Sequence, residues 1–292
     1  MREIGIYWGC FIPTKQYASE LSTRKVLEVL GYNIVELKEF TCCGHPFRGA
    51  FTNVWLYLAF RNIAIADEYG IDLMIMCNGC YLSFREALYL LRERPRDIKG
   101  ITKYLETEGL RLRGKIRILH PIEFFHDVVT IDKLKEYALS DSTVRVAAHY
   151  GCHAIRPGKI GGFDNPRDPT KFENIIKALG LTALRDYPGR LICCGATLMA
   201  IDPELGLKLA ARKISKTAEY GANLLVTTCP YCMEMLDSRQ QSAVKYMNEP
   251  RYIPTMYYQQ LLGLVMGLEP KEIGLNLNQS PIDDVLNILQ RR

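Results

Sequence analysis

The sequence lacks a hydrophobic run long enough to cross a membrane. Its longest apolar stretches, such as residues 261–268, fall well short of the roughly 20 residues that a spanning helix needs. The apolar segment around Trp55 is interrupted by Arg61. Residues 1–10 also lack the charged, apolar and small-residue sections of a secretory signal. We therefore expect no membrane span and a cytoplasmic location.

Charge of one sign is not concentrated anywhere in the sequence. The 292 residues include 37 basic and 32 acidic side chains, a formal net charge of +5, and the basic residues are spread along the chain. Nucleic-acid binding favours a basic patch or stripe, so we expect no nucleic-acid partner, and an anionic small ligand suits this charge better. With 48% hydrophobic and 24% charged residues, the composition is typical of a folded protein with one large core or two modest ones.

Cysteine is the residue present in excess, with ten in the chain. The cysteines form two sets with one order: a single cysteine, an adjacent pair and a CxxC motif. The gaps are 31 and 33 residues in the first set and 40 and 34 in the second. The first set is Cys10, Cys42, Cys43, Cys77 and Cys80, and the second set is Cys152, Cys193, Cys194, Cys229 and Cys232.

The residues around the cysteines repeat as well. Gly9 before Cys10 matches Gly151 before Cys152. At an offset of 151 positions, the motif Glu-Tyr-Gly at 68–70 recurs at 219–221. Self-similarity of this kind indicates two copies of one unit. We therefore predict two domains, one at 1–142 that includes a connection and one at 143–292 that includes a C-terminal tail.

Each unit reads as alternating strands and helices, in the order βαβαβ. Predicted strands at 4–8 and 144–150 lead into the first cysteine, and strands at 73–76 and 224–227 lead into CxxC. A second strand in each unit should end at the cysteine pair. Such alternation predicts parallel sheets, in which sites form beyond the carboxyl ends of the strands. All five cysteines of a unit should therefore converge on one edge.

Two further elements are expected outside the repeated pattern. Residues 115–119 are a strand candidate followed by a helix after Pro121, and residues 282–289 are predicted to form an amphipathic tail helix. We expect the apolar face of this tail helix to cover the protein's own core, although docking on a partner is the alternative.

Five convergent thiols per unit exceed the needs of ordinary metal sites. Adjacent cysteines rarely form a disulfide with one another, because the geometry is strained. Structural zinc and cubane iron–sulfur clusters each use four ligands. A polynuclear iron–sulfur cluster accommodates the fifth sulfur. The alternative is zinc held by four cysteines, with the fifth buried as filler.

The motifs IGIYWGC, TCCGHPF, CNGCY, HYGCH, ICCGAT and CPYC resemble the cysteine-rich CCG domains found in the B subunit of heterodisulfide reductase. The resemblance covers almost the whole chain, including the tail YYQQLLGLVMGLEPKEI. It implies an α/β protein with two repeated βαβ-type CCG domains, related by a pseudo-two-fold axis. Each set of five cysteines would hold one noncubane [4Fe-4S] cluster, with zinc in one domain as the alternative.

The activity that the resemblance implies is that of an oxidoreductase within a multi-subunit complex. A small disulfide, such as the heterodisulfide CoM-S-S-CoB of methanogens, would be reduced to two thiols between the two clusters. Electrons would come through a C-type iron–sulfur subunit from an A-type subunit that contains flavin. The sequence has no ferredoxin-like run of closely spaced cysteines, so a separate protein should donate the electrons. The alternatives are an electron-transfer CCG subunit of another dehydrogenase or sulfur-oxidising complex, and a zinc-stabilised scaffold.

Two histidines and four cations adjoin the cysteines. His153 directly follows Cys152, and His45 lies two residues after Cys43. Imidazole titrates near physiological pH, so both are candidate catalytic proton donors, although each could instead hydrogen-bond a cluster sulfur. Basic side chains that follow cysteines are candidate contacts for an anionic substrate, with ordinary solvated loop charge as the alternative. These are Lys15, Arg48, Arg156 and Lys159.

Overall fold

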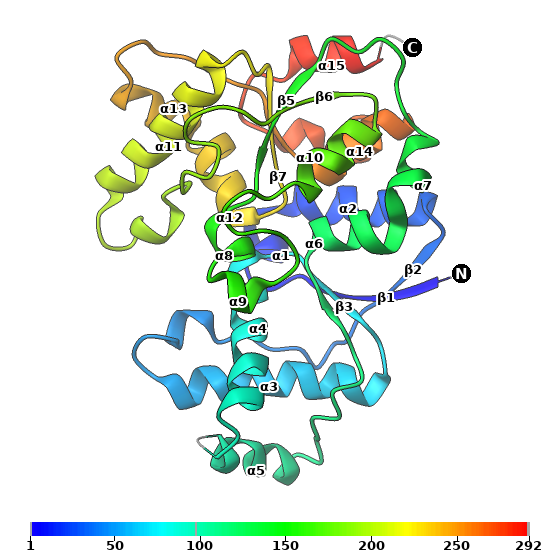
Figure 1. Cartoon of the computed structure of the whole chain (residues 1–292), viewed down its shortest axis with the longest axis vertical. Helices are drawn as coiled ribbons and strands as arrows, with labels where there is room; N and C mark the ends of the chain where they lie inside the picture. Colours follow the sequence, from blue (N-terminus) through cyan, green and yellow to red (C-terminus); the bar gives the residue numbers. More distant parts are fainter. Residues whose placement is uncertain (1, 97, 291–292) are drawn as a thin grey trace.

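The computed structural model describes residues 2–96 and 98–290 and contains two sheets of four strands each, surrounded by helices (Figure 1). The strands are β1 (Arg2–Tyr7), β2 (Tyr32–Val35), β3 (Leu73–Ile75), β4 (Ile118–Leu119), β5 (Arg145–His149), β6 (Thr182–Leu184), β7 (Leu224–Thr227) and β8 (Thr255–Tyr257). Their orders are β2-β1-β3-β4 and β6-β5-β7-β8. Each strand pairing is parallel; Gly5, for example, lies opposite Val35 and Leu73. The predicted fold class of two repeated βαβ units with parallel sheets is confirmed.

Helices connect and cover the strands in the order that the repeat predicts. In the first half they are α1 (Ile12–Lys15), α2 (Tyr17–Val29), α3 (Thr52–Tyr69), α4 (Asn78–Glu93), α5 (Lys99–Thr107), α6 (Pro121–Glu123) and α7 (Ile131–Lys135). In the second half they are α8 (Cys152–Ile155), α9 (Gly158–Gly161), α10 (Lys171–Ala178), α11 (Pro203–Glu219), α12 (Pro230–Met233), α13 (Gln240–Ala243), α14 (Tyr258–Met266) and α15 (Asp283–Gln290). Shorter 3₁₀ and π turns are η1 (His45–Phe47), η2 (Phe124–Thr130), η3 (Ala196–Leu198), η4 (Glu234–Ser238), η5 (Val244–Tyr246) and η6 (Leu275–Leu277).

The second strand of each unit is shorter than predicted and does not reach the cysteine pair. β2 ends at Val35 and β6 at Leu184, and irregular chain follows each strand up to its cysteine pair. In the first unit, side chains bind the backbone groups of Thr41 that no strand partner binds. The Tyr7 hydroxyl donates to the Thr41 carbonyl (2.6 Å), and the Thr41 amide donates to Asn62 Oδ1 (2.8 Å). The prediction that these strands run directly into the cysteines was therefore wrong.

A fourth strand completes each sheet from the chain that follows CxxC. In the first sheet β4 pairs with β3, where Leu73 lies opposite Ile118. In the second sheet β8 pairs with β7, where Leu225 lies opposite Thr255. β4 occupies only the end of the predicted segment 115–119, and β8 was not predicted. The connection and the tail are thus integral parts of the two sheets.

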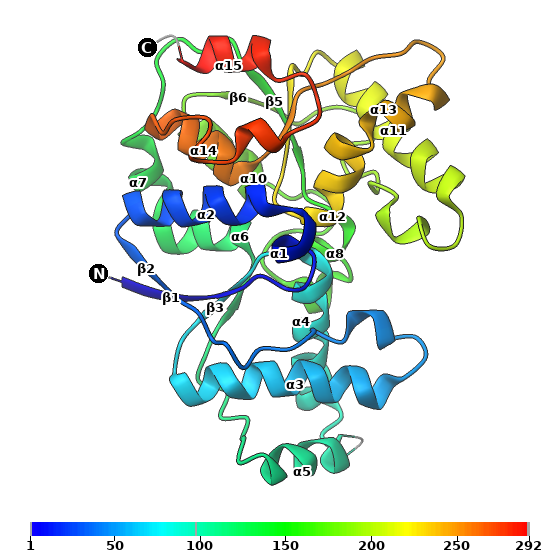
Figure 2. The ribbon, with the colours of Figure 1, turned by 180° about the vertical axis from the view of Figure 1, so that it is seen from behind.

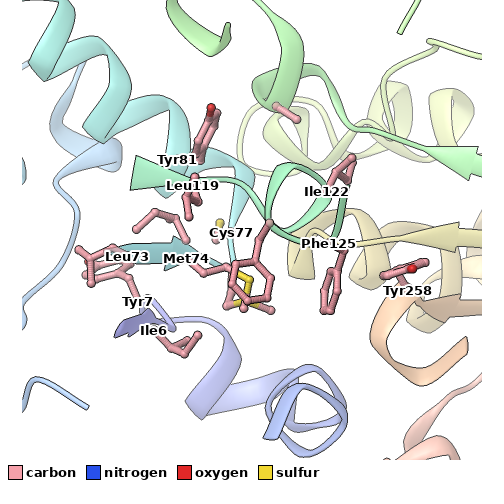
Figure 3. Close-up of a cluster of buried hydrophobic side chains, with 14 of the residues drawn as sticks. Ile6, Tyr7, Leu73, Met74, Cys77, Tyr81, Leu119, Ile122, Phe125 and Tyr258 are labelled. Atoms are coloured by element: carbon pink, nitrogen blue, oxygen red, sulfur yellow. The ribbon is translucent and has the colours of Figure 1, made fainter. Parts of the chain in front are cut away.

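The two halves share one apolar core and exchange helix contacts reciprocally. α2 of the first half packs alongside α14 of the second (Figure 2), and in the equivalent contact α10 of the second half packs against α7 of the first. α4 packs against α8 and α9, where the Tyr81 hydroxyl donates to the Gly161 carbonyl (2.8 Å). Figure 3 shows the core between the halves, where the rings of Phe125 and Tyr258 meet edge to face at 5.1 Å. This reciprocity fits the expected pseudo-two-fold relation, while the boundary at residue 142 stays a prediction.

The tail helix α15 contributes to this core. Its Val285 and Leu289 are buried with the residues that join the two halves. The expectation that it covers the protein's own core is confirmed. Among the residues that the structure describes, no helix combines the length and apolarity required to cross a membrane.

Candidate metal centre

All ten cysteines line a single cavity. Four of them follow central strands directly: Cys10 after β1, Cys77 after β3, Cys152 after β5 and Cys229 after β7. Parallel strands bring their carboxyl ends to the same edge, and the cysteine pairs reach that edge through loops. None of the ten forms a disulfide, and six of them are buried. The predicted convergence therefore extends across both units, with the two sets facing a common space.

Glycines that match in the repeat make this convergence possible. Gly9 and Gly151 both adopt left-handed backbone, with φ of 71° and 74°. A Cβ atom at Gly9 would lie 3.2 Å from Cys80 Sγ. A Cβ atom at Gly151 would lie 3.1 Å from Cys232 Sγ and only 2.4 Å from the side-chain nitrogen of Asn78. In each unit, the turn before the first cysteine can thus pass close to the last one only because it contains glycine.

The sulfur atoms within each set are close enough to interact. In the first set, hydrogen bonds from Cys42 and Cys80 lower the pKa of Cys43 to about 3. In the second set, the Sγ atoms of Cys152 and Cys193 are 3.9 Å apart, and the hydrogen bond from Cys152 lowers the pKa of Cys193 to about 2. In each set, neighbouring thiols thus favour the thiolate form of one cysteine. Clustered sulfur donors of this kind suit soft metals such as iron in a cluster or zinc.

One pair of thiols, Cys77 and Cys229, couples the two sets. Cys77 and Cys229 each occupy the position just before a helix, α4 and α12. The neighbouring Cys229 raises the pKa of Cys77 well above its usual value, and burial adds to the effect. Burial raises the pKa of Cys229, but the neighbouring thiols of Cys232 and Cys77 lower it well below its ordinary range. The two sets are therefore coupled electrostatically across the cavity that both line.

The two predicted proton donors meet in this cavity. His45 comes from the first unit and His153 from the second, and their rings lie edge to face with centroids 5.2 Å apart. Burial lowers the pKa of both imidazoles, and at His45 the neighbouring His153 adds to the effect. Both side chains line the cavity beside the sulfur atoms, where a proton donor would have to stand.

The four predicted anion-binding cations do not line the cavity. Lys15 Nζ is 2.7 Å from Glu234, and Arg48 forms a two-point ion pair with Glu86. Lys159 lies over the ring of Tyr89, at 5.7 Å. The fourth, Arg156, is exposed. Among the described residues that line the cavity, none is lysine or arginine. A role for these four side chains in substrate binding stays a prediction.

Two polar residues at the site were missed by the sequence reasoning. Asn78 is buried between the units: its side-chain amide donates to the Tyr150 carbonyl (2.7 Å), and its oxygen lies 2.9 Å from His120 Nε2. His149 is buried at the end of β5, close to Cys194 and Cys232. Asn78 lies between the two cysteines of the first CxxC motif, so its place in the sequence could have indicated that it belongs to the site. His149 could have been found by aligning the two units, because it stands three residues before a single cysteine.

The fold and the cavity define a class of protein: a duplicated α/β chain in which two sets of five cysteines line one cavity. The CCG "Cysteine-rich domain" family matches residues 4–85 and 146–237. The chain therefore belongs to the CCG family, and within it to the proteins that are like the B subunit of heterodisulfide reductase.

Sequence similarity to three proteins supports this family assignment. The chain is 30% identical to the B subunit of ferredoxin:CoB-CoM heterodisulfide reductase of Methanosarcina mazei over 282 residues, 95% of this chain and 94% of that one. It is 32% identical to a protein of Archaeoglobus profundus described as like the B subunit of heterodisulfide reductase, over 298 residues, 98% and 97% of the two chains. It is 29% identical to the membrane anchor subunit of 8-methylmenaquinol:fumarate reductase of Wolinella succinogenes over 279 residues, 95% and 96%.

The fold also matches a solved structure. A hypothetical protein from Helicobacter pylori superposes with a TM-score of 0.72 at 17% sequence identity, covering 95% of this chain and 52% of that chain. At this identity the likeness concerns the fold alone.

Proposed function

We propose that this protein is the iron–sulfur subunit of a heterodisulfide reductase-like complex, in which a small disulfide is reduced to two thiols. One observation carries the proposal: both sets of five cysteines line the same cavity. A disulfide that enters this cavity has one cysteine set on each side. Two sites on opposite faces of the molecule would have excluded the reaction.

The residues present fit two clusters. Each unit offers five free cysteines, one of which has its pKa lowered by its neighbours, and the second unit adds the buried imidazole of His149 without a hydrogen-bond partner. We assign a [4Fe-4S] cluster of the noncubane type to each set, because five sulfur ligands exceed what a cubane cluster or a structural zinc ion needs. When bound, the clusters would supply the electrons for the reaction.

The reaction balances as RSSR′ plus two electrons and two protons giving RSH and R′SH. The S–S bond breaks, and each sulfur gains one electron and one proton. Two clusters that each pass one electron match this stoichiometry. His45 and His153 line the cavity from opposite units, so each ring nitrogen can deliver a proton to the sulfur on its own side.

The cavity walls favour the sulfur-bearing part of the substrate. Besides cysteine and histidine, they include the stacked rings of Phe11 and Tyr231, with centroids 4.4 Å apart, and Pro46. Charged groups of a heterodisulfide such as CoM-S-S-CoB would therefore stay near the rim. The side chains of Lys15 and Arg48 are partly exposed and could exchange their carboxylate partners for the anionic groups of the substrate.

The electrons come from a separate protein in this proposal. A C-type iron–sulfur subunit and an A-type flavin subunit are the partners that a reductase of this kind requires. A relay role is the second candidate, and the 29% identity to the membrane anchor of the fumarate reductase of Wolinella succinogenes favours it. In that role the clusters would pass electrons without meeting a disulfide.

Anaerobic purification followed by a thiol-release assay tests the proposal. The protein should be brown and hold about eight irons, four for each cluster. With a reduced electron donor and candidate disulfides, free thiol should appear in step with donor oxidation, two thiols for every two electrons. Fast oxidation by a quinone without thiol release from any disulfide would favour the relay. A colourless protein with two zinc ions would reject both functions.

A further inference from the structure

Asn78 links the two cysteine sets through its side chain. It belongs to the first CxxC motif, lines the cavity and is 3% exposed. Its amide nitrogen donates to the carbonyl of Tyr150 (2.7 Å), which lies two residues before Cys152 of the second set. The approach is close, because a Cβ atom at Gly151 would lie 2.4 Å from this nitrogen. A residue of the first motif thus holds the turn that carries the first cysteine of the second set.

His120 holds the amide of Asn78 in this orientation. His120 is fully buried, and burial lowers its pKa to about 3, so the imidazole is neutral. Its Nδ1 accepts from the Ile122 amide (3.2 Å), so the ring proton lies on Nε2. Nε2 then donates to Asn78 Oδ1, 2.9 Å away. With its oxygen bound to His120, the amide presents its nitrogen to Tyr150.

His120 is itself held from both halves of the chain. It follows strand β4 of the first sheet, and its ring stacks on Phe163 of the second half, with centroids 4.8 Å apart and an angle of 7° between the planes. Tyr81 of α4 meets the imidazole edge to face at 5.1 Å. The carboxamide of Asn78 therefore lies between two fixed groups, a donor and an acceptor. Only a side chain that both accepts and donates can join them.

The CxxC motif of the second unit is built differently. Pro230 stands directly after Cys229, where Asn78 stands after Cys77. A proline side chain has neither a hydrogen-bond donor nor an acceptor, so it cannot make the equivalent link to the first unit. The two motifs therefore differ at a position where the repeat would otherwise make them alike.

A second polar bridge between the halves lies at the matching end of the second sheet. Tyr257 ends β8, at the position that His120 holds in the register of the first sheet. Its hydroxyl donates to Gln16 Oε1 of the first half (2.9 Å), and Gln16 Nε2 donates to Glu234 (3.1 Å). Gln16 is not among the residues that line the cavity. This bridge joins the same two halves without using a cysteine motif.

We propose that Asn78 is a positioning residue that fixes the spacing between the two centres. It acts from the first motif on the turn that carries Cys152, so the two cysteine sets keep one separation across the cavity. A disulfide reacts between two centres only if both reach its sulfur atoms, and a misplacement of about 1 Å can cost on the order of 10²-fold in rate. The inference rests on the proposed loading of both sets, and its effect on rate rests on the proposed disulfide reduction.

Asn78→Asp in the full-length, anaerobically purified protein tests the spacing, because the two side chains have the same shape. The carboxylate still accepts from His120, but its second oxygen faces the Tyr150 carbonyl and repels it. We expect about eight irons, as in the wild type. The kcat of thiol release should fall on the order of 10²-fold, and KM should change by less.

Electron paramagnetic resonance gives a readout that does not depend on turnover. The magnetic interaction between two reduced centres depends on their separation. In Asn78→Asp it should be weaker than in the wild type, because the repelled turn moves the second set away from the first.

Gln16→Met is the matched control. It breaks the other polar bridge between the halves, so it should lower the urea midpoint of unfolding. The kcat and the magnetic interaction should stay at their wild-type values. The comparison separates a general weakening of the contact between the halves from a change of spacing at the centres.

His120 supplies a second test that leaves the cysteine motif intact. His120→Phe keeps a ring on Phe163 but removes the donor to Asn78, so kcat and the magnetic interaction should both fall. His120→Gln can donate to Asn78 through its own amide and should retain more of both. If Asn78→Asp does not fold, equal values in these two variants would overturn the proposal.

Asn78→Asp with both centres loaded and with the kcat and magnetic interaction of Gln16→Met would overturn the spacing role and leave the proposed function intact. Loss of iron from one set in Asn78→Asp would also overturn it, because the residue would then serve cluster binding and not spacing. Wild-type protein that binds iron but releases no thiol would overturn the proposed function, while the magnetic interaction would still test Asn78. Protein that binds no iron would overturn both.

Discussion

The thiols of Cys77 and Cys229 shift one another's pKa in the cavity that both line, although the two residues belong to different cysteine sets and follow strands of different sheets. This coupling makes the two candidate metal sites neighbours. It also distinguishes cysteines at the junction from those at the periphery. Cys193, for comparison, has its sulfur contacts with Cys152 and Cys194 inside its own set.

Replacement of Cys193 should affect one centre only. In Cys193→Ala we expect the loss of about half of the bound iron, because one of two clusters loses a ligand. In Cys229→Ala the first centre should be disturbed as well, because Cys229 also raises the pKa of Cys77, which belongs to the first set. Iron analysis and electron paramagnetic resonance of the two variants measure the difference. Equal loss of both signals in Cys193→Ala would mean that the ten cysteines form one shared site.

The two glycines Gly151 and Gly31 form a matched pair for testing the tight turn. Both have left-handed backbone, with φ of 74° and 75°, but a Cβ at Gly31 meets no atom within 4 Å. Gly31→Ala should therefore cost about 1 kcal/mol of the free energy of unfolding and leave the iron content unchanged. Gly151→Ala should cost more and reduce the iron of the second centre, because its Cβ collides with Asn78 and Cys232. Urea unfolding and iron analysis compare them, and equal effects would contradict the steric argument.

The sequence predicted the parts of this site that follow from repetition and strand topology. The cysteine positions repeat, and parallel strands must bring Cys10 and Cys77 to one edge, so convergence within a unit was predictable. Contacts between units were not predictable in the same way. Lys15 pairs with Glu234, which is 219 positions away, and no local sequence pattern predicts a partner at that distance. Strand β8 has only three residues, too few for a periodic signal.

His153 should matter for turnover more than for structure. In His153→Gln we expect thiol release to slow on the order of 10²-fold while the iron content holds, because a positioned proton donor is lost. His126→Gln serves as the control, since His126 bonds to Asp127 away from the cavity. Steady-state assays with matched iron loading measure both variants. If the rate of His153→Gln equals that of the control, His153 is not the proton donor.

Lys213 gives the folded protein a pH dependence that can be measured. It is fully buried on α11, where its amine donates to the Tyr187 hydroxyl (2.7 Å) and to the Arg190 carbonyl (2.9 Å). Burial lowers the pKa of Lys213 to about 7. The unfolded chain keeps this proton up to about pH 10. Between these values the unfolded state binds more protons, so stability rises with pH.

Replacing Lys213 should remove this rise. Between pH 7 and pH 9 the wild type should gain about 2 kcal/mol more in the free energy of unfolding than Lys213→Met does. The control is Lys208→Met, which removes an exposed lysine paired with Glu204 on the same helix. Anaerobic urea unfolding at the two pH values tests the prediction. A Lys213→Met protein with the same pH slope as the control would show that the amine is not responsible.

The reciprocal packing of the helices bears on how such a chain could arise. α2 and α4 bury their apolar faces against α14, α8 and α9, which belong to the opposite copy of the repeat. A polypeptide with a single copy would leave those faces in water unless it associated with a second molecule of itself. Gene duplication then joins a homodimer into one chain, and it frees each half to acquire its own side chains, such as tyrosine in one copy and histidine in the other.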